Sequence, residues 1–237
     1  MIIEAAAYWN ESPMQRTYHF VPLCYGLDDL RYRHLKIAQL DDLNDPFELW
    51  AIAQPDQRLR QAISATKQQM AEQYGLLCFS LDWHNPLLWS HYADRHRGLA
   101  LGFDVNERIL KRVSYVKDRP VLENVKDRPV LEKINFETAD RLLFTKYEDW
   151  HYEQEARIYT TLQDPDPKTG LYFADFGEQL VLREVIAGPL CAVTKQELCD
   201  AAGSATEVEF KKAGLAFDTF RVMIDQRGFG DDQCSSV

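Results

Sequence analysis

The sequence predicts an α+β fold with two small mixed or antiparallel sheets and flanking helices. Predicted strands outnumber long helices, and strands and helices do not alternate regularly along the 237 residues. A doubly wound α/β protein would show that alternation, because each pair of parallel strands needs a crossover helix. No linker rich in Pro and Gly divides the chain, so we expect a single domain over residues 1–237.

The first half of the chain carries signals for four strands and three helices. Apolar, aromatic and β-branched runs predict strands, at Thr17–Leu23, His34–Ala38, Leu76–Leu81 and Leu99–Phe103. Helical spacing of apolar residues predicts helices at 26–32 and 56–74. Asn85 is expected to cap a third helix, with Pro86 in its first position and its end near Arg95, before Gly98.

The second half opens with a duplication of nine residues, Val116–Asn124 followed at once by Val125–Lys133. Two copies are too few for a solenoid, so we expect an enlarged surface loop at 116–133. The remaining pattern predicts a helix at 136–147, strands at 153–161 and 180–186, a helix from Thr194 to Ala202, mixed β structure at 207–225 and a frayed tail at 228–237.

Charge and composition exclude several classes of protein. The net charge of −10 argues against general nucleic-acid binding, which depends on clustered Lys and Arg. The five cysteines are scattered without CxxC spacing, so we expect reduced thiols and no metal site. Met1–Trp9 lacks the basic start of a signal peptide, and no apolar run reaches the ~20 residues that span a bilayer. We therefore expect a cytoplasmic protein that makes no contact with a membrane.

The segment around Glu153 and Glu155 is the strongest candidate for chemistry. On a strand, Glu153, Glu155 and Arg157 would share one face, because side chains alternate between the two faces. Two close carboxylates repel, and burial would raise the pKa of one of them into a range that suits a general base. The alternative is an ordinary surface ion pair, which contributes only ~0–1 kcal/mol.

Two further groups of polar residues could contribute to a site. On the third predicted helix, His91 and Tyr92 either contact a substrate or belong to a packed stripe, and Trp89 lies in the same aromatic segment. His19 in the first strand and Ser80 in a later one either have structural hydrogen-bond partners or point into a cleft. No glycine-rich dinucleotide fingerprint, P-loop or nucleophile elbow is present in the sequence.

Blocks of the sequence carry a resemblance to a known family. The blocks are LKIAQLDDLNDPFEL (35–49), LLCFSLDWHNPLLWSHYADRHRGLALGFD (76–104), VSY (113–115) and K-x-x-x-W-x-x-E-x-E-x-R (146–157). In this combination the chain from about 17 to 190 resembles a bacterial and phage domain family of unknown function that includes abortive-infection AbiG-type proteins. The order of the blocks is also similar to that of ADP-ribosyltransferases, which implies a fold of that kind.

The likeness to ADP-ribosyltransferases implies NAD as a substrate and a role for each residue. His19 would lie beside the nicotinamide ribose, and Ser80 or Tyr92 would shape the nicotinamide pocket. Glu155 would polarise the ribose 2′-hydroxyl, and Glu153 would orient the nucleophile. The remaining binding residues would be His91, Trp89 and Arg157. The chain departs from the pattern because no Ser or Thr follows His19 and Ser80 stands alone.

Three functions follow as expectations. The first is an NAD-dependent ADP-ribosyltransferase-like enzyme that acts as a toxin or phage-defence effector on an unknown macromolecular target. The alternative is a non-catalytic sensor or regulatory partner in phage defence, in which the segment around Trp89 binds a defence-system partner. The third is a metal-dependent hydrolase or nuclease using His91, His96 and His151, which the spacing of the histidines disfavours.

Overall fold

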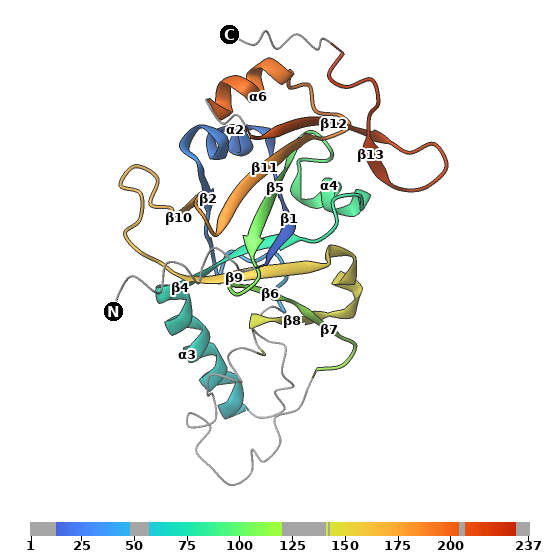
Figure 1. The fold of residues 1–237 in the computed structure, drawn as a ribbon. Helices are drawn as coiled ribbons and strands as arrows, with labels where there is room; N and C mark the ends of the chain where they lie inside the picture. Colours follow the sequence, from blue (N-terminus) through green and yellow to red (C-terminus); the bar gives the residue numbers. More distant parts are fainter. Residues whose placement is uncertain (1–12, 48–56, 120–140, 142, 204–206, 231–237) are drawn as a thin grey trace. The chain divides into compact units, whose positions relative to one another are not determined.

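The chain forms two compact units in the computed structural model, which describes residues 13–47, 57–119, 141, 143–203 and 207–230 (Figure 1). Unit 1 comprises Met1–Lys36, Phe79–Leu110 and Phe173–Val237, and unit 2 comprises Ile37–Cys78 and Lys111–Tyr172. The chain passes from one unit to the other within strand β4 (Tyr74–Ser80). The single domain expected from the sequence stays a prediction.

Unit 1 contains a mixed sheet with the strand order β13-β12-β11-β5-β1. Its strands are β1 (Met14–Val21), β5 (Leu99–Asn106), β11 (Leu180–Ala187), β12 (Glu209–Leu215) and β13 (Val222–Ile224). β11 and β12 run parallel, and the other neighbours are antiparallel. β5 is buried along almost its whole length, which agrees with its apolar sequence and central place. β2 (His34–Lys36) and β10 (Phe173–Asp175) form a separate antiparallel pair.

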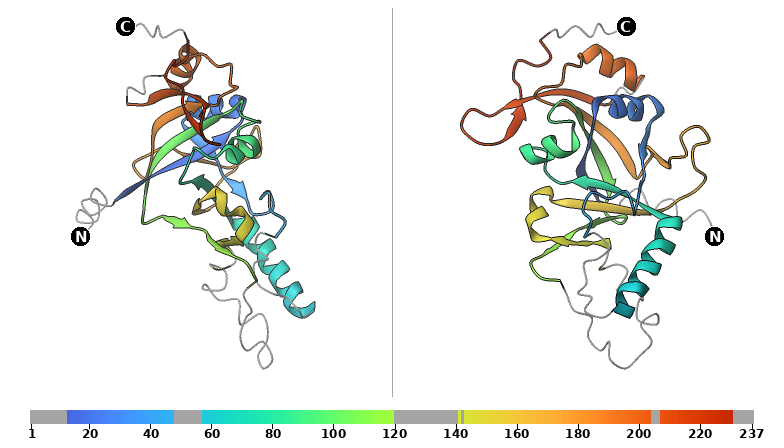
Figure 2. Two further views of the ribbon diagram at one scale, coloured as in Figure 1. Left: turned by 90° about the vertical axis from the view of Figure 1, so that its right-hand side faces the viewer. Right: turned by 180° about the vertical axis from the view of Figure 1, so that it is seen from behind.

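Three helices belong to unit 1, namely α2 (Leu23–Tyr32), α4 (Pro86–Tyr92) and α6 (Lys195–Ala202). α2 and α6 lie side by side, whereas the loop that joins β12 to β13 extends away from the sheet (Figure 2). The Asn85 side chain accepts a hydrogen bond from Leu87 N, and Thr194 forms a capping box with Glu197. Beneath α4, a core packs Trp83, Trp89, Ala93, Ala100, Ile186, Ala213 and Val222.

Unit 2 contains helix α3 (Gln57–Gln73), the 3₁₀ helix η2 (Glu148–Glu153) and several short strands. β4 pairs with β3 (Ala38–Gln39) and β9 (Glu155–Thr161), and β9 pairs with β6 (Leu110–Arg112). β7 (Ser114–Val116) and β8 (Thr145–Tyr147) form a parallel pair. A core of Leu40, Ile63, Ala71, Leu76, Leu143 and Phe144 lies between α3 and the strands.

The predicted α+β class is confirmed, with a large mixed sheet and smaller two-stranded sheets. The ADP-ribosyltransferase-like form of that fold stays a prediction. Most of the duplicated loop, residues 136–140 and 142 of the predicted helix and the last seven residues of the tail lie outside the described residues. No helix in the described ranges is both long enough and apolar enough to span a bilayer.

Two predicted helix ends are wrong. The helix expected to reach Arg95 ends at Tyr92, because Asp94, Arg95 and His96 take left-handed backbone angles with φ of 42°, 52° and 70°. The helix expected to reach Tyr147 is a strand at Thr145–Tyr147, where pairing with Ser114–Val116 suits β-branched and aromatic side chains.

Candidate functional site

Four charged side chains come together inside unit 2 and form what we name the buried cluster: Lys146, Glu153, Glu155 and Arg157. Lys146 comes from β8, Glu153 ends η2, and the other two belong to β9. Their exposed fractions are only 4, 4, 8 and 2% in that order. Lys146 Nζ lies 2.6 Å from Glu153 Oε2 and 3.3 Å from Glu155 Oε2. A buried charge requires such pairing, because desolvation without a partner is very costly.

Arg157 forms a bidentate ion pair with Glu155. Arg157 Nε donates to Glu155 Oε1 at 2.7 Å, and Nη2 donates to Oε2 at 2.8 Å. The third guanidinium nitrogen, Nη1, donates to the carbonyl oxygen of Leu143 at 2.7 Å. Glu155 N in turn donates to the phenol oxygen of Tyr115 at 2.8 Å. The guanidinium and the carboxylate are thus fixed in one orientation.

The surrounding charges keep Glu155 ionised. Burial opposes ionisation, but Arg157 and Lys146 outweigh burial, so the pKa of Glu155 is lowered from its usual value. The sequence led us to expect a raised pKa for one of the two carboxylates, and for Glu155 the shift has the opposite direction. Desolvation raises the pKa of the neighbouring Tyr115 to about 12, so the phenol keeps its proton at neutral pH.

The backbone around Glu153 differs from the prediction. The strand begins at Glu155, because Glu153 closes η2 and Gln154 takes a left-handed conformation with φ of 43°. Glu155 and Arg157 share a strand face as expected, whereas Glu153 reaches them through Lys146 instead. The alternative of a surface ion pair is also wrong, since both partners are buried.

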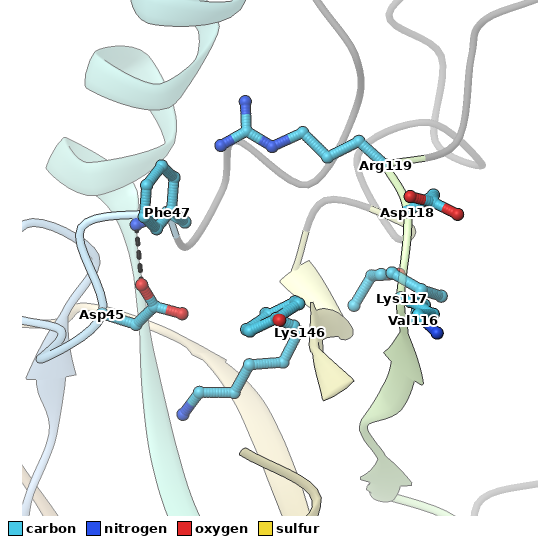
Figure 3. Close-up of a pocket in the computed structure, with 9 residues that line it drawn as sticks. Asp45, Phe47, Val116, Lys117, Asp118, Arg119 and Lys146 are labelled. Carbon is cyan, nitrogen blue, oxygen red and sulfur yellow. Dashed lines mark hydrogen bonds between the residues drawn. The ribbon is translucent and has the colours of Figure 1, made fainter. Parts of the chain in front are cut away.

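A pocket of about 390 Å³ lies next to the buried cluster in unit 2 (Figure 3). Three segments line it, and their residues are Asp45, Phe47, Val116, Lys117, Asp118, Arg119, Thr145, Lys146 and Tyr147. Lys146 therefore belongs both to the pocket wall and to the buried cluster. None of these lining residues was among the site residues predicted from the sequence.

The other predicted site residues lie in unit 1. His19 in β1 packs edge-on against Phe79, with ring centroids 6.0 Å apart. The Ser80 hydroxyl donates to the carbonyl oxygen of Asp82 and accepts from its amide. Ser80 therefore stabilises a local turn at the end of β4. The expectation that His19 and Ser80 form one site with the carboxylates of unit 2 stays a prediction.

The three predicted residues of α4 differ in exposure. Trp89 is fully buried, and its indole N–H donates to the carbonyl oxygen of Trp83 at 2.6 Å. His91 is exposed and Tyr92 is half-buried, with ring centroids 6.1 Å apart. Trp89 thus stabilises the core of unit 1, whereas His91 is an exposed residue of the same helix.

No metal-binding arrangement occurs in the described part of the chain. Within those ranges, no group of three or more His, Cys, Asp or Glu side chains is placed to hold an ion. The four described cysteines are free thiols, and Cys24 among them is exposed.

Comparison with known proteins gives one partial match. No curated protein and no solved structure matches the chain. Residues 88–158 match the model of DUF2971, which is described as a protein of unknown function. The matched segment includes the whole buried cluster and the α4 residues Trp89, His91 and Tyr92, but neither His19 nor Ser80. Over residues 88–158 the chain therefore contains a DUF2971 domain of unknown function.

Proposed function

We propose that this protein is a non-catalytic sensor that binds a small molecule in the pocket of unit 2. The observation that supports the proposal is the double role of Lys146, which lines the pocket and also holds Glu153 and Glu155. A ligand beside Lys146 would change the balance of charges within the buried cluster. The pocket volume of about 390 Å³ suits a small ligand, since such sites usually measure ~300–1,000 Å³.

The hydrogen bonds of Glu155 favour a structural role over a catalytic one. A carboxylate that polarises a sugar hydroxyl must present an oxygen to the substrate. Both oxygens of Glu155 already accept from Arg157, and Oε2 also lies near Lys146. The Glu155 residue is also buried, with an exposed fraction of 8%. Substrate access would require this network to open.

A second candidate is the NAD-dependent ADP-ribosyltransferase-like enzyme. The lowered pKa of Glu155 favours it, because stabilising a positively charged sugar in the transition state needs an ionised carboxylate. In this candidate Glu155 acts on the ribose, Glu153 orients the nucleophile, and His19, Ser80 and Tyr92 bind NAD. The role in phage defence, as sensor or as toxin, depends on the resemblance of the sequence blocks.

Nicotinamide release distinguishes the two candidates. The full chain and its Glu155→Gln variant are incubated with NAD, and free nicotinamide is measured together with the melting temperature of each protein. The exposed Glu178→Gln variant is the matched control. The sensor predicts no release above buffer from any of the three proteins, and a lower melting temperature for Glu155→Gln alone. Release by the wild type that Glu155→Gln loses at an unchanged melting temperature would establish the transferase.

A further inference from the structure

The pocket of unit 2 combines aromatic, cationic and acidic groups on separate parts of its wall. Phe47 and Tyr147 are among the large apolar side chains that remain exposed, with exposed fractions of 58 and 48%. Exposed aromatic rings at a pocket provide stacking surfaces for a planar ligand. This part of the wall therefore suits a ligand that contains a ring.

Two cations of the wall, Lys117 and Arg119, come from the segment after β7. The Arg119 guanidinium lies 4.8 Å from the centre of the Phe47 ring, so a cation–π contact holds it beside the aromatic group. Figure 3 shows Arg119 extending toward Phe47, whereas Asp118 points away from it. Lys117 lines the same pocket. Arg and Lys in this arrangement suit a phosphate, since guanidinium groups bind its oxygens in pairs.

Asp45 supplies an acceptor at another side of the pocket. It is 4% exposed, and its Oδ1 accepts a hydrogen bond from Phe47 N at 2.8 Å, which fixes the carboxylate. Its second oxygen is directed toward the space that the labelled residues surround (Figure 3). A carboxylate only accepts hydrogen bonds when ionised, so it suits a ligand with hydroxyl donors.

We propose that this pocket binds a mononucleotide, an inference that rests on the proposed sensor function. The base would lie against Phe47 and Tyr147, the phosphate would contact Arg119 and Lys117, and a ribose hydroxyl would donate to Asp45. The three chemical groups of a nucleotide thus match the three kinds of wall residue. The volume is near the lower end of the range for small-molecule sites, which suits one nucleotide better than two joined together.

Calorimetric titration of the full chain with AMP tests the assignment. Adenosine lacks the phosphate and ribose 5-phosphate lacks the base, so each is expected to bind at least tenfold more weakly than AMP. Arg119→Gln and Phe47→Ala are expected to weaken AMP binding by about tenfold each, the factor that corresponds to 1.4 kcal/mol. Lys168→Gln, an exposed change in the same unit away from the pocket lining, is the control and keeps wild-type affinity.

Three outcomes would overturn the assignment. The first is the absence of AMP binding at millimolar concentration, and the second is equal affinity of the wild type and Arg119→Gln. The third is tighter binding of NAD than of AMP, which would assign a dinucleotide instead. Nicotinamide release would overturn the sensor and the inference that rests on it, whereas failure to bind AMP without nicotinamide release overturns only the mononucleotide, so the two failures are distinguishable.

Discussion

Two groups of ion pairs in this protein use the same residue types in different surroundings. The buried cluster of unit 2 excludes water, with its Lys146 and Arg157 side chains each 2% exposed. Unit 1 has a second group, Arg16, Asp104, Glu184 and Lys211, which we name the strand-face cluster. Its Arg16 and Lys211 side chains are 38 and 33% exposed. Similar contact distances therefore imply different energies, because water screens the second group and not the first.

The strand-face cluster follows from the register of the unit 1 sheet. Arg16 on β1 lies opposite Asp104 on β5, and their side chains meet at 2.7 Å. Glu184 on β11 lies opposite Gly102, where an added Cβ would come within 2.4 Å of the Glu184 side chain. Glycine at that position leaves the room that the carboxylate occupies. Lys211 on β12 then reaches Glu184 Oε2 at 2.6 Å.

The largest effect is expected from breaking the buried cluster. Arg157→Met leaves Glu155 without its main partner and should lower the free energy of unfolding by about 3–5 kcal/mol. The double variant Glu155→Leu, Arg157→Met should lose less than this single change, because no unpaired carboxylate remains buried. Urea denaturation of the full chain measures both. A double variant that is less stable than Arg157→Met would contradict the comparison.

Asp29 shows what burial does without a cation. It lies in α2 of unit 1 and is 5% exposed, and no cation is among the causes that shift its pKa. Burial and then the neighbouring Asp28 raise the pKa of Asp29 to about 7. The folded state therefore holds the proton up to near neutral pH, whereas the unfolded chain loses it near 3.8. Stability should fall as pH rises between these two values.

Asp29→Asn tests this dependence on pH. The variant should gain about 2–3 kcal/mol relative to the wild type when the pH is raised from 5 to 8. Urea denaturation at both pH values gives the difference. The lowered pKa of Glu155 has the opposite sign, because its contribution is present above its usual value near 4.5 and is lost as the pH falls. A gain for Asp29→Asn that is equal at pH 5 and pH 8 would contradict the raised pKa.

Glu184→Gln should have an intermediate effect. Glu184 is 4% exposed, but its partners Arg16 and Lys211 can turn toward water when the carboxylate is lost. We expect a loss of about 1–2 kcal/mol, close to that of hydrogen bonds to charged groups. Chemical denaturation measures it, with the exposed Glu178→Gln as the matched control. A loss of unfolding free energy as large as that of Arg157→Met would mean that the exposure of the partner side chains does not reduce the cost of removing the carboxylate.

The sequence predicted elements that depend on local signals. The caps at Asn85 and Thr194 are confirmed, because a cap depends on side chains within three residues of the helix start. The end of α4 could not be predicted in the same way. Asp94, Arg95 and His96 are non-glycine residues in left-handed conformations, and contacts with Trp89 and Leu190 backbone atoms hold that turn.

The sequence located part of the buried cluster but not its partners. The E-x-E-x-R pattern placed Glu155 and Arg157 on one strand face, as found. Lys146 was present in the same block of sequence, but nothing local shows that it would turn inward between two carboxylates. The pocket was missed for a similar reason, since Asp45, Arg119 and Tyr147 come from segments that only the tertiary structure brings together.

The smallest effect is expected at the edge of the strand-face cluster, where Arg183 bonds Asp104 at 3.0 Å and Glu207 at 2.9 Å. Arg183 is 37% and Glu207 is 81% exposed, so water competes for both charges. Arg183→Gln should therefore cost less than about 1 kcal/mol. The cost should shrink further in 1 M salt, where charges are screened beyond ~3 Å, whereas that of Arg157→Met should persist because ions do not enter the buried cluster. Equal sensitivity of the two variants to salt in urea denaturation would mean that water reaches both clusters alike.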